Sequence, residues 1–277
     1  MLTKKTIGFL GAGNLAEALI KGLLGSGAVS PAQIVASDRS KARLLHMAET
    51  YEVKVFNENT EAAGAADIVL LTVKPGDAPG VLGEVAPEVA PDKLLISVAA
   101  GLRTERILDL LSAGGPPHPV PVVRAMPNTP ALVGEGMAAL FAGGGATDRD
   151  LAFARAVFEA VGRVIVVDDE DLMDAVTGLS GSGPAYVFLF MEAMAEAGAK
   201  CGLGREDAET LALQTTLGAA ALAQKSPEDL AALREMVTSP GGTTIEGLKR
   251  LEALGFRDAV MEAVEAAAKR ARELSAF

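Results

Sequence analysis

A short apolar strand, a glycine-rich turn and a helical run follow one another at the start of the chain. Residues 6–10 predict the strand, residues 11–16 match the pattern G-x-G-x-x-A, and residues 17–24 have helical periodicity. In this pattern the first glycine makes a tight turn, the second leaves room for a pyrophosphate, and the small last residue lets helix and strand pack closely. The sequence therefore predicts a dinucleotide site with the phosphates at the helix N-terminus. The alternative is a glycine turn with a purely structural role.

The end of the second predicted strand, residues 33–37, should lie beside the ribose of such a nucleotide. Asp38 could accept a hydrogen bond from a ribose 2′-hydroxyl, which favours NAD. A 2′-phosphate would instead form charge-assisted bonds with the neighbouring polar residues Ser37, Arg39, Ser40 and Lys41. We expect NADP, with NADPH as the preferred form and NAD as the alternative. Arg39 and Lys41 would have no such role if they only begin a solvated helix.

Apolar runs that suit buried strands alternate with helical runs over the first 167 residues. Further strands are expected at residues 68–73, 94–98, 122–126, 137–141 and 164–167, with crossover helices such as residues 39–51 and 78–89. Continuously apolar strands that alternate with helices are typical of a parallel sheet buried on both faces. We therefore expect an α/β fold class, with an N-terminal Rossmann-type doubly wound sheet over residues 1–167 as the dinucleotide-binding domain.

The strand pattern stops after Asp168, and residues 168–277 predict an all-α C-terminal domain with breaks at residues 178–184, 202–204, 226–227 and around Ser239. Residues 185–193 are apolar nearly all round, and Pro184 stands at a favoured first helical position. A domain of about 110 residues can hardly cover so much apolar helix within one chain. We therefore expect a homodimer interface here; a central helix in a monomeric bundle is the alternative.

The charge balance excludes several classes of partner. A net charge of -11 and a pI near 4.8 argue against nucleic acid and against acidic membrane surfaces, because binding to phosphate-rich surfaces needs a basic face. A nucleotide cofactor remains compatible, since glycine-rich backbone can supply its contacts. Every apolar run is interrupted by charge before about 18 residues, so we expect no membrane span, no signal peptide and a cytoplasmic location.

Cysteine and histidine are too scarce for several kinds of site. Cys201 is the single cysteine, which excludes an internal disulfide, and we expect it to be a small buried side chain at a helix end. His46 and His118 are the two histidines, so the sequence predicts neither a metal site nor a Ser-His-Asp arrangement.

A second anion site is predicted in residues 237–245, which place small, hydroxyl-bearing and glycine residues between two helical patterns. Its proline and two glycines let the backbone come close to a ligand, and a helix N-terminus offers free N–H groups. A carboxylate fits there, with the hydroxyl of Thr243 or Thr244 beside it. The alternative is an ordinary helix N-cap with a tight turn.

Taken together, the segments quoted above and three more resemble the pyrroline-5-carboxylate reductase family almost from end to end. The matching segments are residues 7–14, 73–75, 123–130, 174–186 and 237–245. The last two are specific to that family, whereas the first is shared with many dehydrogenases. The resemblance implies a Rossmann domain followed by a helical dimerisation domain, in dimers that often assemble into larger rings such as a decamer.

The resemblance also implies a reaction and a substrate site. A cyclic imine that carries a carboxylate would be reduced to proline by hydride from NAD(P)H, which completes proline biosynthesis. Thr244 would donate a hydrogen bond to the ring nitrogen as the catalytic residue, and a hydroxyl is sufficient because the imine is readily protonated. The carboxylate would lie on backbone N–H groups of Ser239, Gly241, Gly242, Thr243 and Thr244.

The same resemblance assigns cofactor contacts along the N-terminal domain. They are Gly11, Gly13, Asn14 and Leu15 at the pyrophosphate, Ser37 and Arg39 near the 2′ position, Asn59 at the adenosine, Thr72, Val73, Lys74, Pro75, Ala99 and Ala100 along the nicotinamide half, and Asn128 closing the site. Lys74 could equally be a strand-end lysine that faces solvent. Asn128 could equally be a turn residue before Pro130.

Two other functions share part of this sequence pattern. A β-hydroxyacid dehydrogenase shares the architecture, but the position of its catalytic lysine is taken here by Val187. A protein that only senses dinucleotides has no reason to keep the loop at residues 239–244. The reductase is therefore the expected function.

Overall fold

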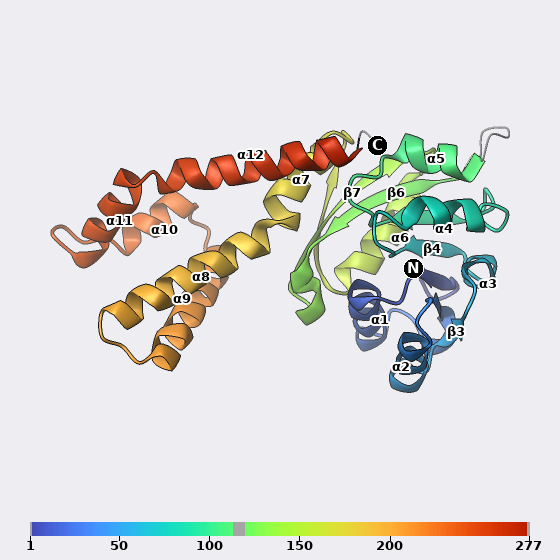
Figure 1. Ribbon diagram of the computed structural model, residues 1–277, viewed down its shortest axis with the longest axis horizontal. Coiled ribbons are helices and arrows are strands. Elements are labelled where there is room, and N and C mark those ends of the chain that lie inside the picture. Colours follow the sequence, from blue (N-terminus) through green and yellow to red (C-terminus); the bar gives the residue numbers. More distant parts are fainter. Residues whose placement is uncertain (1, 113–119, 276–277) are drawn as a thin grey trace. The chain divides into compact units, whose positions relative to one another are not determined.

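The computed structural model describes residues 2–112 and 120–275 (Figure 1). His118 lies outside these residues. The chain divides into two compact units, one made of Met1–Ser182 with Ala266–Phe277 and the other of Gly183–Glu265.

The first unit is built on one mixed sheet. Eight strands of the described residues lie in the order β3-β2-β1-β4-β5-β6-β7-β8, and only the β6–β7 pair among them is antiparallel. The expected doubly wound α/β architecture is confirmed. The strands are β1 Ile7–Leu10, β2 Ile34–Ser37, β3 Lys54–Phe56, β4 Ile68–Leu71, β5 Leu94–Ser97, β6 Val122–Pro127, β7 Gly136–Gly143 and β8 Gly162–Val167.

Helices cover both faces of this sheet (Figure 1). Side chains alternate along β1, so that Phe9 packs in one core with α1, α2 and α6, while Leu10 packs in the other with α3, α4 and α5. The two buried faces explain the continuously apolar strand sequences. The helices of this part are α1 Asn14–Gly25, η1 Pro31–Gln33, α2 Lys41–Tyr51, α3 Asn59–Ala65, α4 Ala78–Val85, α5 Thr104–Ser112, η2 Thr129–Val133 and α6 Asp148–Glu159.

The rest of the chain is helical, as expected, although its first break is placed differently. Its elements are α7 Leu172–Val176, the π-helical turn η3 Thr177–Gly181, α8 Gly183–Lys200, α9 Arg205–Lys225, α10 Leu230–Met236, α11 Thr243–Ala253 and α12 Phe256–Ser275. The predicted break at residues 178–184 is therefore a π turn between two helices, and Pro184 is the second residue of α8. Among the helices of the described residues, none is long and apolar enough to cross a membrane.

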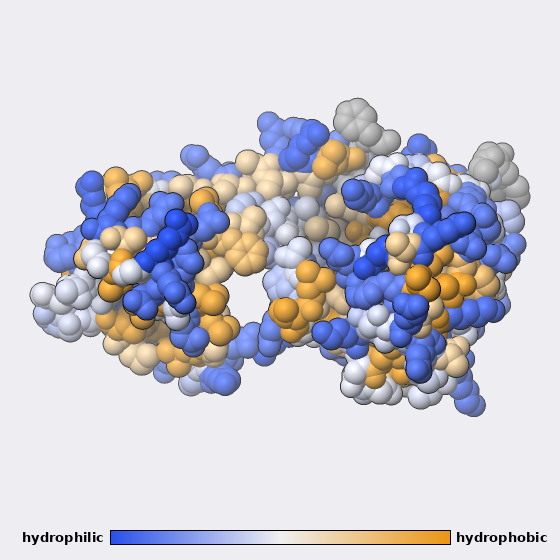
Figure 2. Space-filling view, turned by 60° about the horizontal axis from the view of Figure 1, so that its bottom comes forward, coloured by the Kyte–Doolittle hydropathy of each residue, from blue (hydrophilic) through white to orange (hydrophobic). Residues whose placement is uncertain are grey.

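The second unit leaves much apolar surface uncovered. On α8, Phe188 is 56% exposed and Leu189 65%, and Ala195 is the buried residue of this helix. Figure 2 shows orange, hydrophobic side chains gathered on the helical unit at the left. The single chain thus gives no support to the alternative of a central helix in a monomeric bundle.

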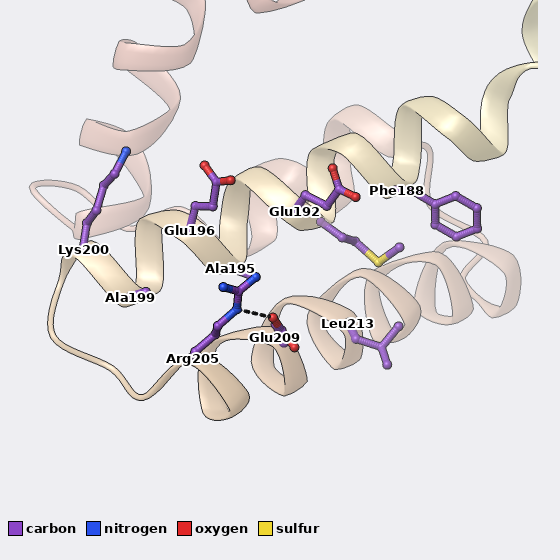
Figure 3. Close-up of a pocket in the computed structure, with 10 residues that line it drawn as sticks. Phe188, Glu192, Ala195, Glu196, Ala199, Lys200, Arg205, Glu209 and Leu213 are labelled. Carbon is purple, nitrogen blue, oxygen red and sulfur yellow. Dashed lines mark hydrogen bonds and ion pairs between the residues drawn. The ribbon is translucent and has the colours of Figure 1, made fainter.

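A groove of about 760 Å³ lies between α8 and α9. Figure 3 shows its mixed lining, with Phe188 and Leu213 near one end and the Arg205–Glu209 pair, 2.9 Å apart, near the other. Cys201 lies in the turn between the two helices and is exposed, so the expectation of a buried cysteine was wrong for this chain. The turn puts the side chain outside the contact between the helices.

Candidate functional site

The glycine loop between β1 and α1 has the shape that its sequence predicts. Gly11 has φ +97°, and a Cβ there would lie 2.8 Å from Val73 Cγ1, so only glycine fits. Gly13 caps α1, and a Cβ there would meet no protein atom within 4 Å. Ala16 is fully buried against the core. The loop is therefore closed on its protein side and open on the side where a phosphate would approach.

Hydrogen bonds hold the loop from several directions. The Gly11 N–H donates to the Ser37 carbonyl over 2.9 Å, and the Thr72 hydroxyl lies 2.7 Å from the Gly11 carbonyl oxygen. The first-turn N–H groups of α1, at Asn14 and Leu15, have no acceptor in the helix itself. They are free to bind an anion, which is the chemistry that a pyrophosphate needs.

The carboxyl ends of neighbouring parallel strands gather the other predicted cofactor residues at one edge of the sheet. The strand register pairs Leu10 with both Ser37 and Leu71, and Leu71 with Ser97. Residues 72–75 and 99–100 follow directly, so they lie along the same edge as the glycine loop. Lys74 is exposed.

At the end of β2, two of the predicted ribose-reading residues already have protein partners. Ser37 is fully buried and donates its hydroxyl to Asn59 Oδ1 over 2.8 Å. Asp38 accepts the Ala12 N–H at Oδ2 and the Ser40 N–H at Oδ1, both over 2.8 Å. Arg39 is different, because its side chain is 86% exposed and pairs with Asp77 over 3.2 Å. Its cationic group is thus accessible to a ligand.

A cluster of charged and polar side chains ties α2 to the start of α1. Glu17 accepts a hydrogen bond from Arg43 Nη2 over 2.7 Å, and its other carboxylate oxygen lies 2.7 Å from His46 Nε2 and 3.0 Å from the Tyr51 hydroxyl. Burial alone would raise the pKa of Glu17, but the bonds to His46, Arg43 and Tyr51 lower it from 4.5 to about 2. Glu17 is therefore a carboxylate over the whole physiological range, and sequence reasoning missed this cluster.

Asn128 joins three segments of the first unit. Its Oδ1 accepts the Met137 N–H over 2.9 Å, and its Nδ2 lies 3.3 Å from the Ser180 carbonyl oxygen in η3. A Cβ on Gly181 would lie 2.5 Å from Met126 Cε, so η3 packs tightly on the end of β6. Asn128 thus holds this turn as well as standing beside the edge of the sheet.

A buried ion pair lies next to this region and was not expected from the sequence. Arg124, 5% exposed, donates to Glu170 Oε1 over 2.7 Å, and the same oxygen accepts the Thr104 N–H over 2.7 Å. Burial opposes ionisation of Glu170, but the bonds from Arg124 and Thr104 together hold its pKa below the usual range. The pair fixes the N-terminus of α5 against β6.

The predicted carboxylate loop lies in the second unit, before α11. The Gly242 N–H donates to the Ser239 carbonyl over 2.9 Å, Gly241 has φ +70°, and a Cβ on Gly242 would collide with Ser239 Oγ. Gly242 caps α11 without a side-chain hydrogen bond, so the first N–H groups of that helix are left free. Thr243, exposed, and Thr244, half-buried, are the first two residues of the helix. This arrangement can bind a carboxylate and place a hydroxyl beside it.

Two family models match the two parts of the chain. Residues 6–101 match the family described as NADP oxidoreductase coenzyme F420-dependent. Residues 170–274 match the family described as pyrroline-5-carboxylate reductase dimerisation.

Whole-chain relatives and solved structures agree with this match. Pyrroline-5-carboxylate reductase from Synechocystis is 46% identical and the enzyme from Arabidopsis thaliana 43%, with 97% of this chain covered in both cases and 97% and 95% of the relatives. A pyrroline-5-carboxylate reductase structure from Coxiella burnetii superposes with a TM-score of 0.92 at 39% identity, covering 99% of each chain. The Plasmodium falciparum pyrroline carboxylate reductase, solved with NADP bound, has a TM-score of 0.85 at 32% identity and 98% coverage of each chain. The chain belongs to the pyrroline-5-carboxylate reductase family.

Proposed function

We propose that the protein reduces 1-pyrroline-5-carboxylate to L-proline by hydride transfer from NAD(P)H, as the last step of proline biosynthesis. The observation that carries the proposal is that one chain has two helix N-termini prepared for anions, at α1 and at α11, in a family whose members bear this enzyme name. The first suits a pyrophosphate and the second a carboxylate.

The residues around the first helix fit a dinucleotide. The open space beside Gly13 and the free N–H groups of Asn14 and Leu15 suit a pyrophosphate, which a Cβ at Gly13 would displace. Residues 72–75, Ala99 and Ala100 are proposed along the nicotinamide half, with Asn59 at the adenosine and Asn128 closing the site. A bound reduced nicotinamide supplies the hydride that adds to the imine carbon.

The loop before α11 is the proposed substrate site. Backbone N–H groups of Ser239, Gly241, Gly242, Thr243 and Thr244 hold the carboxylate, and the Thr244 hydroxyl donates a hydrogen bond to the ring nitrogen. A cyclic imine is readily protonated, so the nitrogen takes its proton from solvent, and a neutral hydroxyl that positions the ring meets the chemical need. No charged acid is required at this position.

NADPH is the proposed cofactor, with NADH as the alternative. Both carboxylate oxygens of Asp38 already accept backbone N–H groups, whereas the Arg39 guanidinium is largely exposed and supports recognition of a 2′-phosphate. The variant Arg39→Ala should raise the KM for NADPH much more than the KM for NADH. Equal effects would remove Arg39 from recognition of the 2′-phosphate. Ser37 is also proposed near the 2′ position, where its hydroxyl donates to Asn59 Oδ1.

A homodimer through the helical domain is proposed as the minimal assembly, with a decamer as the larger one. The exposed apolar side chains of α8 and the match to a dimerisation family support the dimer. We also propose that the dinucleotide-binding domain ends at residue 167 and the helical domain begins at residue 168. A cytoplasmic location is a further proposal, and cell fractionation with an antibody checks it.

The test is the loss of NADPH absorbance on addition of pyrroline-5-carboxylate, repeated with NADH, with proline identified as the product. Oxidation of NADPH with stoichiometric formation of proline is expected. A second assay offers β-hydroxyacids with NADP⁺, because a β-hydroxyacid dehydrogenase would oxidise these substrates. Activity on hydroxyacids alone would contradict the proposal.

A further inference from the structure

We propose that Arg43 is a positioning residue for the dinucleotide, because its guanidinium fixes the carbonyl groups of the glycine loop so that the N–H groups of the loop face the pyrophosphate. This inference rests on the proposed function. Arg43 lies on α2, thirty-one residues beyond Ala12, and the predicted cofactor contacts do not include it. It touches the loop that would hold the cofactor.

The contacts of Arg43 reach two successive peptide groups of the loop. Its Nε donates to the Ala12 carbonyl oxygen over 2.8 Å, and its Nη2 approaches the Gly13 carbonyl oxygen at 3.4 Å. The Ala12 N–H is held from the other side by Asp38 Oδ2 over 2.8 Å. The peptide groups on both sides of Ala12 are therefore fixed by Asp38, which directly follows β2, and by Arg43 of α2.

This arrangement separates the donors of the loop from its acceptors. Thr72 lies beside the Gly11 carbonyl and Arg43 beside the next two carbonyls, so all three oxygens have donors within the protein. The N–H groups of Asn14 and Leu15 remain free. A carbonyl oxygen that turned toward the ligand would repel a phosphate, and a loop fixed before binding loses less conformational entropy when the ligand arrives.

Glu17 in turn fixes the guanidinium. The Arg43 Nη2 lies 2.7 Å from Glu17 Oε2, and the other oxygen of Glu17 is engaged by His46 and Tyr51. The side chains of Arg43 and Glu17 are 29% and 24% exposed, so the pair is mostly enclosed. The Glu17 carboxylate compensates the charge of Arg43. Arg43 therefore affects the cofactor mainly by holding the glycine loop in place, and less by its charge. A planar fork can serve the loop and Glu17 at once, which an ammonium group cannot do equally well.

The test measures dinucleotide binding without substrate, from the change of nicotinamide fluorescence. Arg43→Met keeps most of the apolar stem and removes every donor, and it should raise the dissociation constants of NADPH and NADH by a similar factor of about 10. Arg43→Lys keeps the charge without the fork and should recover only part of the affinity. At saturating cofactor, kcat and the KM for pyrroline-5-carboxylate should stay within about twofold of wild type.

Arg39→Ala is the matched control. Arg39 is four residues before Arg43, but it pairs with Asp77 and does not touch the glycine loop. Its loss of affinity should be confined to NADPH. Unchanged affinity in Arg43→Met, a loss confined to NADPH, or full recovery in Arg43→Lys would each overturn the inference.

A folding defect would not obscure the result. Circular dichroism and thermal unfolding of each variant check that it is folded. If Arg43→Met fails to fold because the Glu17 carboxylate has lost its partner, the double variant Glu17→Gln with Arg43→Met replaces it. The double variant should lose affinity for NADPH and NADH by a similar factor. Wild-type affinity in this variant would overturn the inference. A wild-type protein that binds neither dinucleotide would instead contradict the proposed function itself.

Discussion

Thr244 stands at the start of α11, half-buried beside the free N–H groups of that helix. Thr244→Ala removes one hydroxyl and should lower kcat by about 10-fold to 1000-fold, because the ring nitrogen loses its hydrogen-bond donor. The dissociation constant of NADPH should stay nearly unchanged. Steady-state kinetics and fluorescence titration check these two values, and Thr244→Ser, which retains the hydroxyl, is the control that should recover most of the rate. Unchanged turnover in Thr244→Ala would remove this residue from the mechanism.

The lowered pKa of Glu17 predicts how the free energy of unfolding changes at acid pH. Its pKa is lowered to about 2 in the folded protein from the ordinary value of 4.5, so the unfolded chain takes up this proton at higher pH than the folded one. The stabilisation is fully present above the ordinary value and is lost as the pH falls toward the lowered one. The free energy of unfolding should therefore fall less steeply below pH 5, about the ordinary value, in Glu17→Gln than in wild type.

Urea titrations at a series of pH values measure this difference. The carboxylates of Asp67 and Glu170, whose pKa values are also lowered, are present in both proteins and provide the shared background. Identical slopes for wild type and Glu17→Gln would contradict the assignment.

Side-chain contacts between distant segments were the part of the site that the sequence could not predict. The glycine pattern located the loop, because glycines at a fixed spacing indicate where the backbone makes this turn. Arg43 contacts Ala12 only because α2 packs beside α1, and no local pattern encodes that packing. The pairing of Ser37 with Asn59 was missed for the same reason.

At the scale of secondary-structure elements, the two glycines of the turn should respond differently to alanine. Gly11→Ala forces a side chain into a left-handed backbone conformation and against Val73, so it should lower the free energy of unfolding by about 1–3 kcal/mol. Gly13→Ala meets no protein atom within 4 Å and has φ −71°, so its cost to stability should be limited to the poorer N-cap and be smaller than that of Gly11→Ala. It should nevertheless weaken binding of both dinucleotides, because the added methyl takes the place of the pyrophosphate.

Thermal unfolding and fluorescence titration of the two variants separate these effects. Wild-type affinity in Gly13→Ala would contradict the placement of the pyrophosphate. Wild-type stability in Gly11→Ala would contradict the geometry of the turn.

Apolar periodicity predicted seven of the eight described strands, but it missed β3, gave η3 as a break, and did not single out the helices α3, α5 and α6. β3 is an edge strand of three residues, Lys54–Phe56, with one exposed and two half-buried side chains, so it has no apolar run to indicate it. The glycines and serines of η3 suggested a break, whereas the chain continues as a π turn because Gly181 can approach Met126 closely. Local composition does not reveal such a tertiary contact.

At the scale of the whole molecule, α8 should carry the contact between two chains. Leu189→Glu puts a charge on a residue that is 65% exposed in the single chain, and it should convert dimers to monomers because a charge in an apolar interface is costly. Sedimentation velocity measures the change. Leu45→Glu alters an equally apolar side chain, 58% exposed on α2 of the first unit, and should leave the assembly intact. A dimeric Leu189→Glu protein would contradict the proposed interface.

The all-round apolar sequence of residues 185–193 led to the prediction of an interface on this helix, because a helix without a polar face must be covered by something. The exposure of Phe188 and Leu189 agrees with the expectation that one chain can hardly cover this helix.

The last turns of α12 belong to the first compact unit, not to the helical one. Leu274 lies against Gly101, where an added Cβ would be 3.1 Å from Leu274 Cβ, and the Ser275 hydroxyl donates to Asp174 Oδ1 over 3.4 Å. During synthesis residues 266–275 must therefore leave the ribosome before the first unit can complete its fold. A nascent chain stalled before residue 266 would expose the surface of the first unit that these residues cover.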